Sequence, residues 1–179
     1  MNFHQLQVAY DVNEDRILMR ISFKTEAQIP QEYRAWLTRR MVRNLWPYVV
    51  RAMETRVVLE QPGAAHVKSD IVEMEYQATL SEFAASGNFE QPYEAQDYEF
   101  PMGESPLLVT RADFTILKDQ PVRINFLPSS GKGFEIGLPP KLWHGFCSML
   151  QAAVASANWD YVLNLPGNAS AEAGERVLN

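Results

Sequence analysis

The residues best suited to binding chemistry are arginines that crowd one predicted helix. Helical spacing places Arg40, Arg43 and Arg51 on one side of that helix, with Arg39 beside them. Guanidinium groups arranged in this way can bind the phosphate oxygens of a nucleic acid. A solvated helix face opposite an apolar stripe has the same pattern. We therefore keep phosphate binding by Arg39, Arg40, Arg43 and Arg51 as one hypothesis, with a solvated face as its alternative.

The second candidate is an acidic stretch rich in aromatic residues, 88–106, which we call the acidic arm. It contains three prolines and five acidic residues, and it has neither helical nor strand periodicity. Its aromatic residues are the kind that anchor protein interfaces, and they are Phe89, Tyr93, Tyr98 and Phe100. The arm could present these anchors to a protein partner, lie over the arginines and screen them, or form an ordered surface loop packed on its own aromatics.

Other motifs carry less chemistry. His144 and Cys147 are three residues apart and could share a metal ion, but a structural zinc needs four ligands. We predict no metal site there, and expect a core cysteine and a histidine at the core edge. Residues 129–133, SSGKG, lack the first glycine and the Ser/Thr after lysine of a phosphate loop, so we predict a hairpin turn. We find no catalytic motif and predict no cofactor.

A strand that feeds a helix occurs twice and must position these candidates. Residues 33–55 (YRAWLTRRMVRNLWPYVVRAMET) align without gaps on 134–156 (FEIGLPPKLWHGFCSMLQAAVAS). Apolar residues follow each other at i, i+4 in both copies, which predicts helices that cover a sheet with one face. The helix flanks pair Val42 and Trp46 with Trp143 and Cys147, so volume is exchanged at matched positions and both flanks should be buried.

Three strands precede each helix. In the first copy they are 4–10, 16–23 and about 32–37, with a turn at 11–15. Thr38 is the expected N-cap of the helix that follows, and Pro47 predicts a kink rather than a break, because the apolar stripe keeps its phase. In the second copy the strands are 107–118, 122–127 and 134–138, before a helix that Pro139 and Pro140 begin.

Between the copies, residues 64–85 predict a helix with Val67, Ile71, Met74 and Ala78 on one side. The prediction is one α+β domain over 1–165, built as two βββα repeats related by a pseudo-twofold axis, in which helices cover an antiparallel sheet. Its parts are repeat one (1–58), the acidic helix and arm (59–105) and repeat two (106–159). The small polar residues after Trp159 predict fraying, with 166–179 as a flexible tail.

Composition and charge bound the class of protein. The 179 residues are 46% hydrophobic and 21% charged, as in a soluble globular domain that can bury a proper core. The net charge of −6 is uneven, because one lysine accompanies ten acidic residues in 59–105. No stretch has the run of about 18 apolar residues of a membrane helix, and the N-terminus lacks secretory features. With a single cysteine, this predicts a cytoplasmic protein.

Two phrases, QLQVAYDVNEDRILMRIS and WLTRRMVRNLWP, resemble a group of small proteobacterial proteins usually described as hypothetical. The resemblance covers the first third of the chain best and implies no activity, cofactor or site. In topology, two sheet-plus-helix repeats are similar to the Whirly-type single-stranded nucleic-acid-binding proteins, which have four strands per repeat where we predict three.

Three function classes follow from these observations. The first is a non-enzymatic protein-binding or adaptor domain that uses the acidic arm or an uncovered sheet face. The second is a single-stranded nucleic-acid-binding module with the arm as an autoinhibitory mimic of phosphate, although a net charge of −6 opposes such binding. The third is a small-ligand binder or enzyme with a site between the repeats. A homodimer through an exposed sheet edge is a further alternative.

Overall fold

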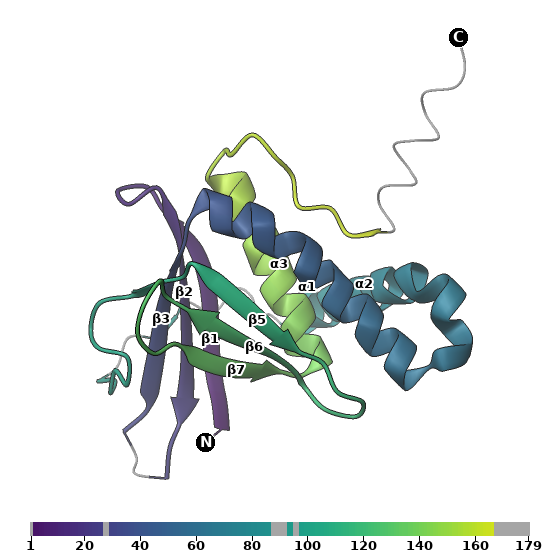
Figure 1. Cartoon of the computed structure of the whole chain (residues 1–179), viewed down its shortest axis with the longest axis horizontal. Coiled ribbons are helices and arrows are strands. Elements are labelled where there is room, and N and C mark those ends of the chain that lie inside the picture. The colour runs from purple at the N-terminus through teal and green to yellow at the C-terminus, as the bar shows by residue number, and fades with distance from the viewer. Residues whose placement is uncertain (1, 27–28, 87–92, 95–96, 167–179) are drawn as a thin grey trace.

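The computed structural model describes residues 2–26, 29–86, 93–94 and 97–166 (Figure 1). Strands and helices alternate in groups, which confirms the predicted α+β class. The elements are β1 (Asn2–Asp11), β2 (Arg16–Lys24), β3 (Gln31–Leu37), α1 (Arg39–Glu60), a 3-10 helix (Pro62–Val67), α2 (Lys68–Ser86), β4 (Leu107–Leu108), β5 (Arg111–Thr115), β6 (Val122–Leu127), β7 (Phe134–Leu138) and α3 (Pro140–Ser156).

The first sheet has the strand order β1-β2-β3-β4, with antiparallel pairs except for the parallel pair β3–β4. The predicted turn at 11–15 joins β1 to β2, and Asp11 Oδ1 accepts hydrogen bonds from the backbone N of Asn13 (2.9 Å) and Glu14 (3.1 Å). Because side chains alternate along a strand, Met19 and Ile21 point into the core while Arg20 and Ser22 lie on the opposite, outer face.

The second sheet has the order β5-β6-β7 and is antiparallel. The prediction of one strand over 107–118 is wrong, because the chain changes sheets within it. Val109 N donates to Trp36 O of β3 (3.1 Å), whereas Thr110 N donates to Leu127 O of β6 (2.9 Å). One straight strand cannot pair with both sheets, because their strands cross each other (Figure 1). The single predicted sheet is therefore two sheets.

Helix α1 begins where the sequence predicts. Thr38 Oγ1 accepts a hydrogen bond from Met41 N (3.2 Å), which confirms it as the N-cap. The helix continues through Pro47, whose exposed position keeps its ring away from the core. The flanking residues Val42, Trp46, Trp143 and Cys147 are all buried, as the exchanged volumes predict.

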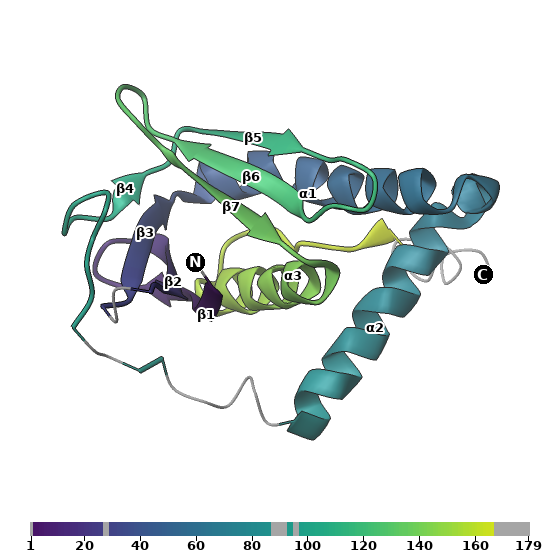
Figure 2. The ribbon, with the colours of Figure 1, turned by 90° about the horizontal axis from the view of Figure 1, so that it is seen from below.

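Helices α1 and α3 each pack against the sheet formed by the other half of the chain. Helix α3 packs against β1, and Tyr48 of α1 stacks on Phe114 of β5 with ring centroids 6.5 Å apart. Figure 2 shows α1 running along the second sheet, with α3 on the other side of β7. The two sheets also touch directly, since the rings of Tyr33 and Phe134 are 5.2 Å apart. The core therefore lies between sheets and helices that come from both halves of the chain.

Helix α2 lies beside α1 and α3, but a different face is buried from the one predicted. Val72, Tyr76 and Thr79 are buried, whereas Met74 is 71% exposed. Apolar periodicity is weak in this acidic helix, so polar contacts to neighbouring helices set its rotation. Tyr76 OH, for example, donates to Gln151 Oε1 of α3 (2.6 Å).

The segment that follows α3 is packed rather than frayed. Trp159, Leu163 and Leu165 are buried, and Leu163 O accepts a hydrogen bond from Gln151 Nε2 (2.6 Å). Trp46 Nε1 of α1 donates to Asn164 O (2.8 Å). The expectation that the chain frays directly after Trp159 is therefore wrong for these residues. The predicted tail, 166–179, lies outside the described residues apart from Pro166.

Candidate functional site

The outer face of the first sheet carries a row of charged side chains. The register pairs Arg20 with Arg34 and Ser22 with Glu32 across β2 and β3. All four side chains lie opposite the buried Met19 and Ile21, so alternation along the strands places them on one surface. Two arginines and one carboxylate thus lie side by side on the sheet face opposite the core.

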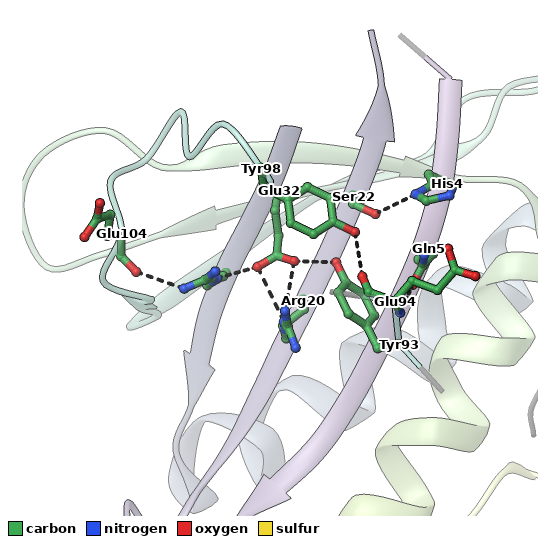
Figure 3. Close-up of polar contacts among 10 residues, drawn as sticks. His4, Gln5, Arg20, Ser22, Glu32, Tyr93, Glu94, Tyr98 and Glu104 are labelled. Atoms are coloured by element: carbon green, nitrogen blue, oxygen red, sulfur yellow. Dashed lines mark hydrogen bonds and ion pairs between the residues drawn. The ribbon is translucent and has the colours of Figure 1, made fainter. Parts of the chain in front are cut away.

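Glu32 is the centre of this row and is fully buried. Arg20 Nη2 donates to Glu32 Oε2 (3.2 Å), Arg34 Nε donates to Oε1, and Tyr93 OH donates to Oε2 (2.6 Å; Figure 3). Burial acts to raise the pKa of Glu32, but the bonds from Tyr93, Arg34 and Arg20 outweigh it and the pKa lies below its usual value. Glu32 is therefore a charged anchor for the acidic arm.

The described residues of the arm cover this row. The Tyr93 ring lies 4.1 Å from the Arg20 guanidinium carbon, and the Phe100 ring lies 4.0 Å from that of Arg34. The backbone also joins the sheet, because Glu32 N donates to Glu99 O (2.9 Å). Tyr93 and Phe100 thus contact sheet arginines, and Tyr98 OH donates to Glu94 O (3.1 Å). Phe89, the fourth predicted anchor, lies outside the described residues.

The arginines of α1 are in a different place. Arg39 forms an ion pair with Asp160, and Arg40, Arg43 and Arg51 are exposed. The contacts of the arm's described residues go to Arg20 and Arg34 instead. The sequence analysis did not single out Arg20 or Glu32. Pairing the predicted strands 16–23 and 32–37 side by side would have brought these two residues close together. The missing information was the register.

A groove lies beside β1, the edge strand of the first sheet, and has a volume of about 660 Å³. Every residue from Phe3 to Ala9 lines it, so side chains of both sheet faces reach it and it follows the strand edge itself. We call it the edge groove. Its remaining lining comes from three other elements: Phe83 of α2, Tyr93 and Glu94 of the arm, and Leu142, Gly145 and Met149 of α3.

The edge groove has two unlike walls. On the core side, Leu142, Gly145 and Met149 form one face of α3, where Gly145 offers no side chain. On the outer side, Tyr93 is held by Glu32, and Glu94 N donates to Gln5 Oε1 of β1 (3.0 Å; Figure 3). The walls therefore belong to opposite faces of the first sheet, with the β1 edge between them.

The outer edge of β1 has backbone N–H and C=O groups that make no hydrogen bond to another described strand. β1 pairs with β2 alone, and none of the backbone hydrogen bonds between described segments outside the ladders involves it. Every second residue of an edge strand points its N–H and C=O away from the sheet. The residues from Phe3 to Ala9 line the edge groove, with a register irregularity between Phe3 and Gln5.

A second polar cluster joins the buried His144 and Arg56 to the partly exposed Glu75. His144 is buried between α2 and α3, with Nε2 3.5 Å from Glu75 Oε2, and Glu75 also pairs with Arg56. Burial acts to raise the pKa of Glu75, but the His144 hydrogen bond and the Arg56 charge outweigh it and lower that pKa. No group of three or more potential metal ligands occurs among the described residues. Cys147 is buried, and burial raises the pKa of its thiol.

Within the described part of the chain, no helix is long and apolar enough to cross a membrane. Comparison of the whole chain with protein-family models, with curated proteins and with solved structures finds no match.

Proposed function

We propose that this chain is a protein-binding domain that captures an extended segment of a partner by adding it as a strand beside β1. The observation that carries the proposal is the edge groove, in which a strand edge that no described residue pairs with lies between two walls. Strand addition supplies main-chain hydrogen bonds for affinity, and pockets for alternate side chains supply specificity.

The dimensions of the groove suit an extended peptide. Phe3 to Ala9 line it, and at about 3.4 Å per residue this stretch is about 20 Å long. An added strand would lie about 4.8 Å from β1 and send alternate side chains toward α3 and toward Tyr93. The main-chain donors and acceptors of β1 would then gain partners, and the apolar surface of Leu142 and Met149 would be covered.

The acidic arm has a different role in this proposal from the one its composition indicates. Tyr93 and Phe100 contact Arg20 and Arg34 within the chain, so they are not free anchors. The arm instead supplies one wall of the edge groove through Tyr93 and Glu94.

The proposal can be tested by capture and hydrogen exchange together. The full chain, a Met149→Arg variant that places a long charged side chain in the groove, and a Met74→Arg control on the exposed face of α2 are used to capture partners from the source cell's lysate. We expect the wild type and Met74→Arg to retain a partner that Met149→Arg loses. In the captured complex, amides of residues 3–9 should exchange more slowly than in the free chain.

The same experiment can contradict the proposal. A partner that Met149→Arg retains, or one that leaves β1 amide exchange unchanged, would place the binding surface elsewhere. Circular dichroism of both variants separates lost binding from lost folding. Nucleic acid that is recovered and then released by salt would instead favour the site at Arg39, Arg40, Arg43 and Arg51.

A small apolar ligand is the second candidate, because the volume of about 660 Å³ falls within the range of ligand pockets and the groove lies between the two halves of the chain. Such a ligand would contact the side chains of Leu142 and Met149. A ligand without main-chain groups would leave the exchange of β1 amides nearly unchanged, which distinguishes it from a bound strand.

We also infer that the two βββα units are related by a pseudo-twofold axis. Supporting this, α1 of the first unit packs on the second sheet while α3 of the second packs on the first. Superposition of residues 33–53 on 134–154 in an experimental structure would test it. A rotation far from 180° would contradict the inference.

A further inference from the structure

We propose that the segment bound beside β1 carries a lysine or arginine on its outer-facing side, opposite Glu94, and apolar residues on its core-facing side. This inference rests on the proposed function and specifies the chemistry of the partner. It follows from the different composition of the two walls of the edge groove.

The outer wall carries the exposed carboxylate of Glu94. Among the described residues that line the groove, Glu94 is the only carboxylate, and none is lysine or arginine. Its backbone is held by the bond from Glu94 N to Gln5 Oε1 (3.0 Å), while its exposed carboxylate has no ion pair among the described residues. A charge held in this way favours a cationic side chain that lies opposite it.

The surroundings strengthen that preference. The acidic helix and arm, 59–105, contain ten acidic residues and one lysine, and both elements border the groove through Phe83, Tyr93 and Glu94. A field of one sign attracts segments of opposite charge and repels acidic ones. An acidic segment would therefore bind least well.

The core-side wall selects apolar residues. Leu142 and Met149 flank Gly145 on one face of α3, so the centre of this wall has no side chain and its ends are apolar. Because the residues of an added strand alternate between faces, those opposite Leu6 and Val8 of β1 face α3, and those opposite Gln5 and Gln7 face the outer wall. The partner should alternate apolar residues with polar ones, and one of the polar positions should be basic.

A displayed library of random nine-residue segments tests this directly. It is selected on the full chain, on Glu94→Gln, and on the control Glu104→Gln, which removes an exposed arm carboxylate that does not line the groove. We expect the wild type and Glu104→Gln to enrich alternating apolar residues with Lys or Arg at one polar position. Glu94→Gln should keep the alternation and lose the basic preference.

An enriched segment is then synthesised with its basic residue changed to glutamine. The change should weaken binding by about three- to fivefold on the wild type at low salt, and by less than that on Glu94→Gln, because an exposed charge pair has a modest, screened effect.

The two proposals fail in different ways. Segments that alternate and slow β1 amide exchange but show no basic preference would overturn this inference and leave strand addition standing. The absence of any enriched segment, or enrichment that Met149→Arg does not reduce, would overturn both. A concentration-dependent dimer of the free chain whose β1 amides are protected would replace the partner with a second copy of this chain and also overturn it.

Discussion

Glu32 holds two distant parts of the chain together through one buried charge. It accepts hydrogen bonds from Arg20 and Arg34 on the sheet and from Tyr93 on the arm. The bond to Tyr93 holds a residue that lines the edge groove. A buried carboxylate is stable only while its partners remain, because its desolvation has to be offset. Stability and the shape of the groove are therefore linked at this residue.

Glu32→Gln should lower the free energy of unfolding by about 2–4 kcal/mol, because Arg20 and Arg34 would then face each other without a counter-ion. Urea unfolding measures the loss. Glu135→Gln is the matched control on the second sheet, since its pair with Arg123 is exposed on both sides (45% and 41%) and should contribute less than about 1 kcal/mol. Equal losses in the two variants would show that burial of Glu32 has no energetic consequence.

The lowered pKa of Glu32 also predicts a pH dependence. The unfolded chain has an ordinary glutamate pKa of about 4.3, so the stabilisation is complete above that pH and is lost as the pH falls through the lower folded value. The unfolding free energy should decline between about pH 5 and pH 3. Glu32→Gln should make this decline shallower without removing it, because Glu75 also has a lowered pKa. An unchanged slope would contradict the assignment.

At the scale of elements, nearby residues determine where a helix begins, whereas distant residues determine which of its faces is buried. Thr38 caps α1 through a bond to a residue three positions away, so the cap was readable from the sequence. The buried face of α2 depends on contacts such as Tyr76 with Gln151, which are 75 positions apart. For that reason the cap was predicted correctly and the face of α2 was not.

Thr38→Ala should lower the unfolding free energy by about 1 kcal/mol, because an amide of the first turn of α1 loses its acceptor. Thr38→Ser keeps the hydroxyl and should stay close to the wild type. Thermal and urea unfolding of the pair isolate the cap. Equal losses in the two variants would assign the effect to the methyl group instead.

At the scale of the whole molecule, each half of the chain covers apolar surface of the other half. Helix α3 packs against β1, and the segment after α3 returns to α1, where Trp46 Nε1 binds Asn164 O. Neither half buries its own apolar surface alone. The edge groove is a product of this exchange, since β1 comes from the start of the chain and α3 from its end.

Truncation tests how far the cooperative fold extends. A chain that ends at residue 166 should unfold within about 0.5 kcal/mol of the full chain. A chain that ends at 157 loses three buried side chains, those of Trp159, Leu163 and Leu165, and at least about 4 kcal/mol with them. That is a large part of a typical total, so we expect it not to fold. Circular dichroism and urea unfolding check this, and equal midpoints would show that 158–166 contribute nothing.

Most of the strands, helices and turns of this protein could be predicted from its sequence. Strand-forming segments at 4–10, 16–23 and about 32–37 predicted β1, β2 and β3. Spacing of i, i+4 predicted α1 and α3, and the turn chemistry of 11–15 predicted the first hairpin, because each pattern acts between residues a few positions apart. The exchanged volumes of Val42 and Trp46 against Trp143 and Cys147 also indicated that both helix flanks are buried. The aromatic composition of the arm offered an ordered surface loop as one alternative, and Tyr93 and Phe100 do pack, although on Arg20 and Arg34 of the sheet.

Only the tertiary structure decided where the arm lies and where a partner could bind. The segment 107–118, predicted as one strand, divides between the two sheets. Val109 N donates to Trp36 O of the first sheet, and Thr110 N donates to Leu127 O of the second. Register brought Arg20, Glu32 and Arg34 together, and only this cluster gave Tyr93 its partner. The edge groove joins residues from both ends of the chain and from its middle. Such a site cannot be recognised from a local sequence pattern, because the spacing of Leu142, Gly145 and Met149 does not indicate which strand edge they face.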